Sequence, residues 1–278
     1  MALVSIKPFL QQARKSHFAI PLFDAFDSLS AEGIFQAFES RGAAGIIAIY
    51  APLIDQPQGE ALAAYVKARA ERSSAPVSLM LDHGGSVEQC IKAIKLGFSD
   101  VMFDGSRLAF EENKEQTRLV VRAAHVLGLG AEAELGHVGS GSEYQDIEAH
   151  RKGFTNPDLV AEFVQETQVD FLAVAIGNAH GLYQGEPHLD LSLLEAIAEK
   201  TEIPLVLHGG TGISESDFKA SFARGIAKVN VATDLYQEAG RRLSESCRQG
   251  ETSYFKLSEI MVNAFRERCG YFIDLFSH

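Results

Sequence analysis

The stretch HFAIPLFDAF (residues 17–26) is an apolar, strand-like run that ends at a carboxylate, and seven similar runs follow it along the chain. Most of them are apolar on both alternating faces, as expected of strands that are covered on both sides. The other seven runs are AGIIAIYA (44–51), PVSLMLDH (76–83), SDVMFDGS (99–106), LGAEAELG (129–136), VDFLAVAIGN (169–178), IPLVLHGG (203–210) and AKVNVATD (227–234).

Helix-start patterns occupy the segments between these runs. They are Ser86 with Gln89, Asn156 with Pro157, Ser192 with Glu195, and Ser214 with Asp217. Eight strands alternating with eight helices predict an α/β fold, a TIM (β/α)8 barrel, in one domain over residues 1–278. An open doubly wound sheet is the structural alternative, but no GxGxxG pattern follows the first run. Two long loops, 139–155 and 179–188, follow strand ends and can build an active site.

Composition limits the partners of the protein. The 278 residues are 46% hydrophobic and 22% charged, which excludes a disordered chain or a coiled coil. The net charge of −12 opposes nonspecific binding to nucleic acid or to an anionic membrane. Three cysteines are too few for a disulfide framework, and the chain shows neither a signal-peptide pattern nor a membrane-spanning run. We therefore expect a soluble cytoplasmic protein.

Polar residues gather where the predicted strands end. A single histidine at such a place is commonly structural, but three from separate strands, His83, His180 and His208, indicate a Zn²⁺ or similar ion. Glu132 and Glu134 share one face of the fifth strand, so one can bind the metal while the other orients a ligand. The remaining polar strand-end residues are Asp24, Asp82, Asp104, Asn178, Asn230, Thr233 and Asp234.

Glycines after two of these histidines indicate an anion site. Gly209, Gly210 and Gly212 lie in HGGTG (208–212), and Gly181 follows His180. A glycine-rich turn is by itself more often only a tight turn. Beside a metal site, and after the seventh strand of a barrel, it predicts a phosphate cradle.

Six motifs in order resemble the class II, metal-dependent ketose-bisphosphate aldolases, and the chain is most similar to their shorter, tagatose-type branch. Fructose-bisphosphate and tagatose-bisphosphate aldolases belong to this family. The motifs are LDHGGS (81–86), VMFDGS (101–106), EAELGHVG (132–139), AVAIGNAHGLY (173–183), LVLHGGTG (205–212) and KVNVATDL (228–235).

The resemblance implies a role for each matching residue. Asp82 would be the general acid and base for the aldehyde hydroxyl, and Glu143 would move the proton on the carbon beside the ketone. Glu134 would be an alternate metal ligand and Asp104 a polar partner near the metal. The zinc ligands would be His83, His180 and His208. The phosphate of dihydroxyacetone phosphate would be bound by Gly181, Gly209, Thr211, Asn230 and Thr233.

The resemblance also implies carbohydrate metabolism such as glycolysis, a ketose phosphate substrate, glyceraldehyde 3-phosphate as the aldehyde product, and a homodimer or homotetramer. A monovalent cation near the phosphate site is a further expectation. Asp24 stands where relatives carry Asn, which adds a negative charge near an anionic substrate. The identity of the sugar, and whether it carries one phosphate or two, stays open.

The chemistry of aldol cleavage offers a separate argument for a metal. Breaking a carbon–carbon bond beside a ketone requires either a metal ion or a lysine imine. We expect no lysine at a strand end inside the barrel, because Lys228 is predicted to lie at the entry of its strand, on the opposite rim. Two other functions remain open: a barrel metal hydrolase, and a sugar-phosphate-binding protein without catalysis.

Overall fold

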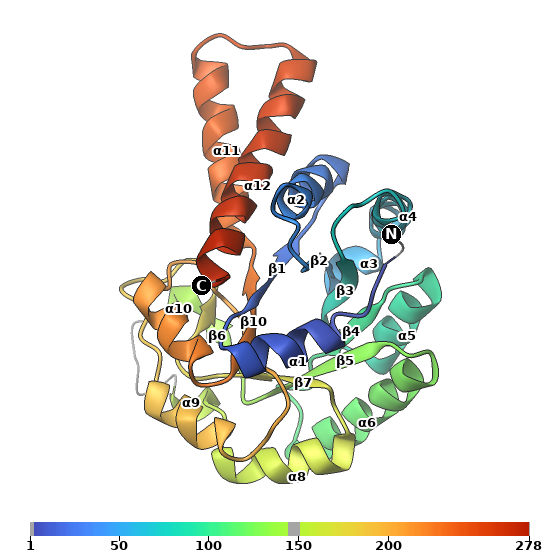
Figure 1. Ribbon diagram of the computed structural model, residues 1–278, viewed down its shortest axis with the longest axis vertical. Helices are drawn as coiled ribbons and strands as arrows, with labels where there is room; N and C mark the ends of the chain where they lie inside the picture. Colours follow the sequence, from blue (N-terminus) through green and yellow to red (C-terminus); the bar gives the residue numbers. More distant parts are fainter. Residues whose placement is uncertain (1–2, 144–150, 278) are drawn as a thin grey trace.

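Eight parallel strands close into a barrel in the computed structural model, which describes residues 3–143 and 151–277 (Figure 1). The neighbouring order is β1-β10-β9-β7-β5-β4-β3-β2, which confirms the predicted TIM barrel. Each strand corresponds to one of the eight apolar runs. The strands are β1 (Ile20–Asp24), β2 (Gly45–Tyr50), β3 (Val77–Gly84), β4 (Asp100–Phe103), β5 (Gly130–Leu135), β7 (Phe171–Val174), β9 (Leu205–Leu207) and β10 (Ile226–Val231).

Helices surround the barrel on the outside (Figure 1). Their apolar sides pack against the outward faces of the strands and form one large core. The helices are α1 (Lys7–Ser16), α2 (Ser28–Arg41), α3 (Ala51–Ile54), α4 (Pro57–Ala70), α5 (Val87–Leu96), α6 (Phe110–Val126), α8 (Pro157–Thr167), α9 (Leu191–Ala198), α10 (Glu215–Phe222), α11 (Thr233–Arg248) and α12 (Tyr254–Phe276), with short 3-10 turns η1 (Gly141–Glu143) and η2 (Arg151–Gly153).

Three of the four predicted helix starts are confirmed. Ser86, Asn156 and Ser214 each accept a backbone hydrogen bond at the start of α5, α8 and α10. The prediction for Ser192 is wrong, because Asp190 caps α9 by accepting a hydrogen bond of 2.9 Å from the Leu193 amide. A carboxylate at this position accepts a hydrogen bond from an amide that has no partner within the helix, and it interacts favourably with the positive end of the helix dipole.

The segment before β1 closes the amino-terminal end of the barrel. In Figure 1, α1 crosses in front of the strands. Ile6, Leu10 and Ala13 belong to the same buried cluster as Leu22 and Met80 of the barrel interior. Because this end is closed, a site must be sought at the other end, where the strands finish.

Two of the loops at that other end pair with each other. β6 (Gly139–Ser140) and β8 (Ala179–His180) form a short parallel ladder in which Ser140 is the register partner of His180. The sequence predicts loops for both segments. A ladder of two residues is too short to produce a pattern in sequence, but it fixes the backbone that carries His180.

Candidate metal centre

A cavity of about 870 Å³ opens at the carboxyl end of the barrel strands. Nearly all of the predicted site residues line it, and among the described ones only Glu134 does not. The predicted residues in its wall are Asp82, His83, Asp104, His180, Gly181, His208, Gly209, Thr211, Asn230 and Thr233. The side chain of Glu143 lies outside the described residues, so its predicted role stays a prediction.

Three imidazoles meet at the floor of this cavity. Nε2 of His83 lies 2.9 Å from Nδ1 of His208, and the ring centroids of His83 and His180 are 4.7 Å apart. One nitrogen from each ring lies within 4.8 Å of the others, which is close enough to bind a common ion. His83 has a φ of 53°, in the left-handed region that non-glycine residues rarely adopt. Such strain is typical of functional positions.

The second nitrogen of each ring is occupied by the protein. Nδ1 of His83 lies 2.8 Å from Oδ2 of Asp104, and Nε2 of His208 lies 2.8 Å from Oε1 of Glu132. The ring of His180 is hydrogen-bonded to the backbone of Val138. Nε2 of His180 is buried and has no hydrogen-bond partner among the described residues. Imidazoles that are held from behind, with one nitrogen turned to a shared centre, are typical of metal ligands. The residues therefore fit a divalent ion.

The charges around the three rings also favour a cation. Burial opposes charge on His83, but Asp82, Asp104 and Glu134 raise its pKa to about 10. Burial and the charge on His83 lower the pKa of His180 to about 4, and burial lowers that of His208 well below its usual value. The surroundings therefore favour a positive charge on His83 and disfavour one on His180 and His208. A divalent ion would supply the missing positive charge.

Glu134 lies behind the cluster, where it can serve as an alternate ligand. Its Oε1 accepts a hydrogen bond of 2.9 Å from the Val138 amide, and its buried Oε2, 4.0 Å from Nδ1 of His83, has no hydrogen-bond partner among the described residues. Burial and the neighbouring Asp104 raise its pKa to about 8. Ligand atoms of Glu134, Asp104 and His83 lie within 4.8 Å of one another.

The prediction for Lys228 is wrong. Its side chain lies inside the barrel, fully buried, with Nζ 2.9 Å from Oε2 of Glu132 and 2.8 Å from Oδ1 of Asn230. The expectation that the barrel interior holds no lysine is therefore wrong, and it no longer argues against an imine. Lys228 does not line the cavity, and its ion pair with Glu132 occupies the amine that an imine would need.

The general-base candidate is held in place at the edge of the cluster. Oδ1 of Asp82 accepts a hydrogen bond of 2.9 Å from the side-chain amide of Asn230. Asn230 in turn accepts from Lys228. The side-chain amide of Asn230 is thus held by two hydrogen bonds, one at its oxygen and one at its nitrogen, and the second of these bonds orients Oδ1 of Asp82.

The glycine-rich loops approach each other closely. Gly209 has a φ of 67°, and a Cβ there would lie 2.0 Å from the carbonyl oxygen of Ala179, so only glycine fits. The hydroxyl of Tyr183 donates to the Gly209 carbonyl at 3.1 Å and accepts from the Ala179 amide at 2.8 Å. Sequence reasoning missed this tyrosine, because a bond between two loops leaves no local pattern.

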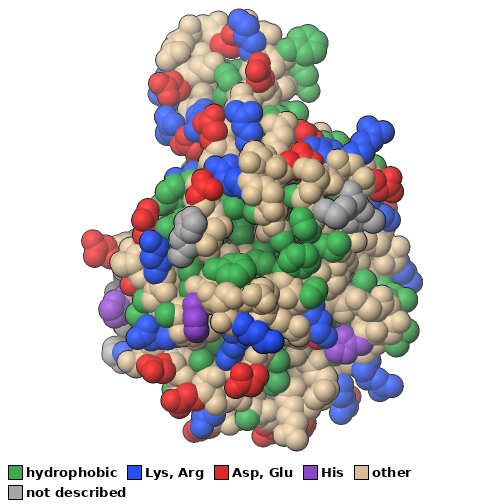
Figure 2. Space-filling model, in the orientation of Figure 1, with side chains coloured by type: hydrophobic (Ala, Val, Ile, Leu, Met, Phe, Trp, Pro, Cys, Tyr) green, Lys and Arg blue, Asp and Glu red, His purple; other side chains and the backbone are tan. Residues whose placement is uncertain are grey.

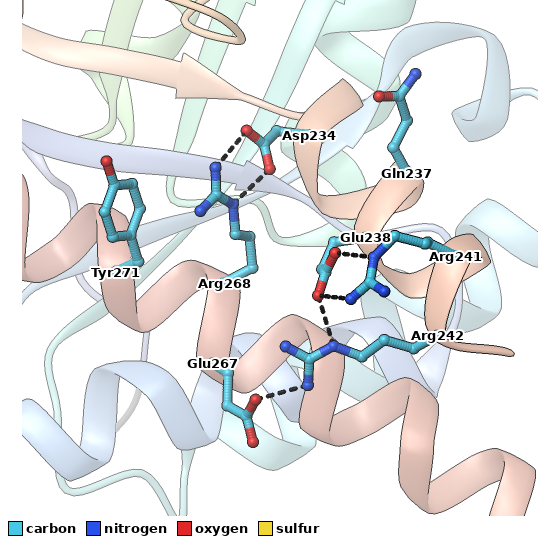
Figure 3. Close-up of a pocket in the computed structure, with 8 residues that line it drawn as sticks. All are labelled: Asp234, Gln237, Glu238, Arg241, Arg242, Glu267, Arg268 and Tyr271. Atoms are coloured by element: carbon cyan, nitrogen blue, oxygen red, sulfur yellow. Dashed lines mark hydrogen bonds and ion pairs between the residues drawn. The ribbon is translucent and has the colours of Figure 1, made fainter. Parts of the chain in front are cut away.

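A second hollow lies between α11 and α12, outside the barrel (Figure 3). It contains three arginines, which could suggest an anion site. Each of them is paired: Arg241 and Arg242 contact Glu238, and Arg268 binds Asp234 through two hydrogen bonds. The hollow is therefore an ion-pair network, and the barrel mouth is the better candidate for the chemistry.

A cluster of three imidazoles beside glycine-rich loops therefore lies at the carboxyl end of a (β/α)8 barrel, where enzymes of this fold carry their active sites. The model of the family "Fructose-bisphosphate aldolase class-II" matches residues 4–278. The chain belongs to this family, which confirms the resemblance found in its motifs.

Individual relatives agree with this assignment. The chain is 34% identical over 275 residues to a sulfofructosephosphate aldolase of Alkalicoccus urumqiensis, covering 96% of each protein. It is 38% identical over 249 residues to a probable fructose-bisphosphate aldolase of Bacillus subtilis (strain 168), covering 88% of this chain and 87% of the relative. The crystal structure of the YdjI aldolase from Escherichia coli K12 superposes with a TM-score of 0.88 at 33% identity, covering 99% of this chain and 97% of that one.

Proposed function

We propose that this class II aldolase uses one divalent ion, Zn²⁺, to split a ketose phosphate reversibly into dihydroxyacetone phosphate and an aldehyde. The observation that carries the proposal is the meeting of His83, His180 and His208, each with one ring nitrogen within 4.8 Å of the others. The ion would stabilise the negative oxygen that develops when the bond beside the ketone breaks. The family membership supports the reaction type, and the names of the relatives support a phosphorylated sugar.

The protein's own residues would orient the substrate and move its protons. Asp82 lines the cavity beside His83 and would take the proton from the hydroxyl of the aldehyde half during cleavage. The proton on the carbon beside the ketone is assigned to Glu143, from the resemblance. Glu134 would replace a ligand when the substrate approaches.

The phosphate of the dihydroxyacetone phosphate half would bind on the side formed by the loops after β8, β9 and β10. Gly181, Gly209, Thr211 and Thr233 line the cavity there. Thr233 begins α11, a helix of 16 residues whose amino-terminal end favours an anion. Asn230 would contact the phosphate half from the strand below, and a monovalent cation would assist there. The protein would act in the cytoplasm, in sugar metabolism, as one barrel domain.

Removal of the ion tests this proposal. Dialysis against a chelator should abolish release of dihydroxyacetone phosphate, and added Zn²⁺ should restore it. Borohydride with dihydroxyacetone phosphate should attach nothing to Lys228, as judged by mass spectrometry, because the reaction uses no imine. Activity that survives complete chelation, or a trapped adduct, would reject the metal mechanism. Hydrolysis of the substrate without dihydroxyacetone phosphate release would support a barrel hydrolase, and binding without turnover would support a binding protein.

A further inference from the structure

The mouth of the barrel has two chemically different sides. The side formed by the loops after β8, β9 and β10 carries glycines and threonine hydroxyls, which suit a phosphate. The side formed by the ends of β1 and β2, together with Tyr236 of α11, carries one carboxylate and three aromatic rings, namely Asp24, Phe26, Tyr50 and Tyr236. The rings of Phe26 and Tyr236 meet edge to face at 4.3 Å. A ketose phosphate that places its phosphate on the first side must place its other end elsewhere in this cavity.

Asp24 has an unsatisfied carboxylate oxygen on this second side. Its side chain lines the cavity and is only 5% exposed, and its buried Oδ1 has no hydrogen-bond partner among the described residues. Burial and the nearby Asp82 raise its pKa well above the usual value. The hydroxyl of Tyr236 is likewise buried without a partner in the described part of the chain. Two unsatisfied polar groups beside one cavity call for a ligand with hydroxyl groups, since a hydroxyl both donates and accepts hydrogen bonds.

In the described part of the chain, this side also carries no lysine or arginine that would bind a second phosphate. The helix after β1, α2, has its amino-terminal end occupied by the carboxylate of Asp27, which accepts from the Ser30 amide at 2.7 Å. Arg107 is the only lysine or arginine among the described lining residues, and it follows β4, which two strands separate from β1. The undescribed segment 144–150 (YQDIEAH) contains neither lysine nor arginine. A phosphate here would lie beside the carboxyl groups of Asp24 and Asp82, with no lysine or arginine of the described lining residues on the same side.

We propose that the substrate is a ketose 1-phosphate whose far end is an uncharged polyol, and that Asp24 determines this specificity by hydrogen bonding to a hydroxyl of the aldehyde half. The inference rests on the proposed aldol cleavage and specifies its substrate class. A sugar hydroxyl can donate to or accept from the carboxyl of Asp24, whereas a second phosphate would add negative charge beside Asp24 and Asp82, two groups whose charges already disfavour each other. The aromatic rings offer the flat apolar surface on which the carbon-bound hydrogens of a polyol can pack.

The test compares matched substrates. Release of dihydroxyacetone phosphate is measured for the 1-phosphates and the 1,6-bisphosphates of all four D-ketohexoses and their L enantiomers, so that stereochemistry does not confound the result. For the Zn²⁺-loaded protein we expect kcat/KM of the best monophosphate to exceed that of the best bisphosphate by at least about tenfold. D24N, which keeps the size of the side chain but replaces the carboxyl by an amide that cannot ionise, should lower this ratio by about tenfold or more. D158N, at an exposed position in α8, removes one charge far from the cavity and should leave the ratio unchanged.

The outcomes separate the two proposals. A native preference for bisphosphates, or the same ratio in D24N as in the native protein, overturns the inference and leaves the aldolase proposal intact. Absence of dihydroxyacetone phosphate release from every substrate overturns the aldolase proposal and, with it, the inference. If D24N does not fold, the ratio measured for the native protein decides the question by itself.

Discussion

At the scale of single residues, the buried pair of Lys228 and Glu132 supports the metal centre from inside the barrel. Glu132 has one oxygen near Nζ of Lys228 at 2.9 Å and the other near Nε2 of His208 at 2.8 Å. Burial raises the pKa of Glu132, and the charge of Lys228 opposes that rise. Lys228 therefore favours the ionised form of Glu132, which accepts a hydrogen bond from Nε2–H of His208 and leaves Nδ1 of His208 as the lone-pair nitrogen.

Replacing Lys228 by methionine should weaken metal binding. Without the ammonium group, Glu132 loses its counter-charge, and we expect the affinity for Zn²⁺ to fall by about 10–100-fold, as for other residues that orient metal ligands. Competition with a chelating dye measures this directly and does not depend on turnover. K200M, at an exposed position, is the matched control. An unpaired buried carboxylate can also unfold a protein, so the double variant K228M/E132Q, which leaves no charge unpaired, provides a second measurement. Native affinity in both variants would contradict the proposed role.

The alternation of a strand explains what sequence could and could not predict at this scale. Asn230 was expected to face the site, and residues two apart on a strand share a face, so Lys228 could have been placed inside the barrel by the same argument. Its place at the entry of the strand suggested the opposite rim instead, and the structure shows that Glu132 provides the partner that burial requires. The partner comes from β5, which is distant in sequence, and no local pattern connects the two residues.

At the scale of elements, hydrogen bonds from several segments at the amino-terminal end of the barrel converge on one carboxylate. Asp100, at the start of β4, accepts hydrogen bonds from the Ser5 hydroxyl at 2.7 Å and the Ile6 amide at 2.9 Å. It also accepts from the Ser78 hydroxyl at 2.6 Å and the Gly130 amide at 3.1 Å. Burial raises the pKa of Asp100 to about 7 despite these bonds. One side chain thus joins the segment before α1 to three strands.

This carboxylate should make stability depend on pH. The pKa is raised in the folded state, so the folded protein binds more protons than the unfolded chain between about pH 4 and pH 7, and stability falls as pH rises through this range. D100N cannot titrate. The free energy of unfolding of the native protein, taken relative to D100N, should therefore fall by up to about 1.4 kcal/mol per pH unit between about pH 5 and pH 7. Urea unfolding at about pH 5 and about pH 7 measures this difference in the free energy of unfolding. The helix-capping variant D190N is the control. A constant difference between native protein and D100N would show that Asp100 does not titrate there.

Element prediction succeeded where each element is specified locally. The eight strands follow from runs of apolar residues, and Ser86 and Ser214 cap their helices through neighbouring residues alone. It failed for the start of α9, where two candidate caps lie two residues apart and the carboxylate of Asp190 prevails. The β6–β8 ladder depends on two loops brought together by the closed barrel, so it could not be predicted before the fold itself.

At the scale of the whole molecule, α11 and α12 form a hairpin that projects from the barrel (Figure 1). α12 packs closely on α2. A Cβ added to Gly33 of α2 would lie only 2.6 Å from the Cβ of Phe265 of α12, so the two helices meet where α2 has no side chain. Charged side chains of both signs cover the hairpin, and hydrophobic side chains gather near its tip (Figure 2). Tyr254 and Phe255, which begin α12, are 74% and 83% exposed. None of the described helices is long and apolar enough to span a membrane.

Two adjacent exposed aromatic residues on a projecting element favour contact with a second copy of the chain, which agrees with the homodimer or homotetramer expected from the resemblance. Light scattering of the purified protein should give two or four times the mass of one chain. Replacing both Tyr254 and Phe255 by serine should shift the mass toward a single chain at micromolar concentration, because the apolar area lost would no longer offset the entropy of association. L127S, at a 61% exposed position on the barrel, should leave the mass unchanged. The metal ligands and the cavity come from one barrel, so the dissociated variant should still bind Zn²⁺. A native protein with the mass of one chain would contradict the assembly, and an unchanged mass in the double variant would exclude the hairpin tip as its contact.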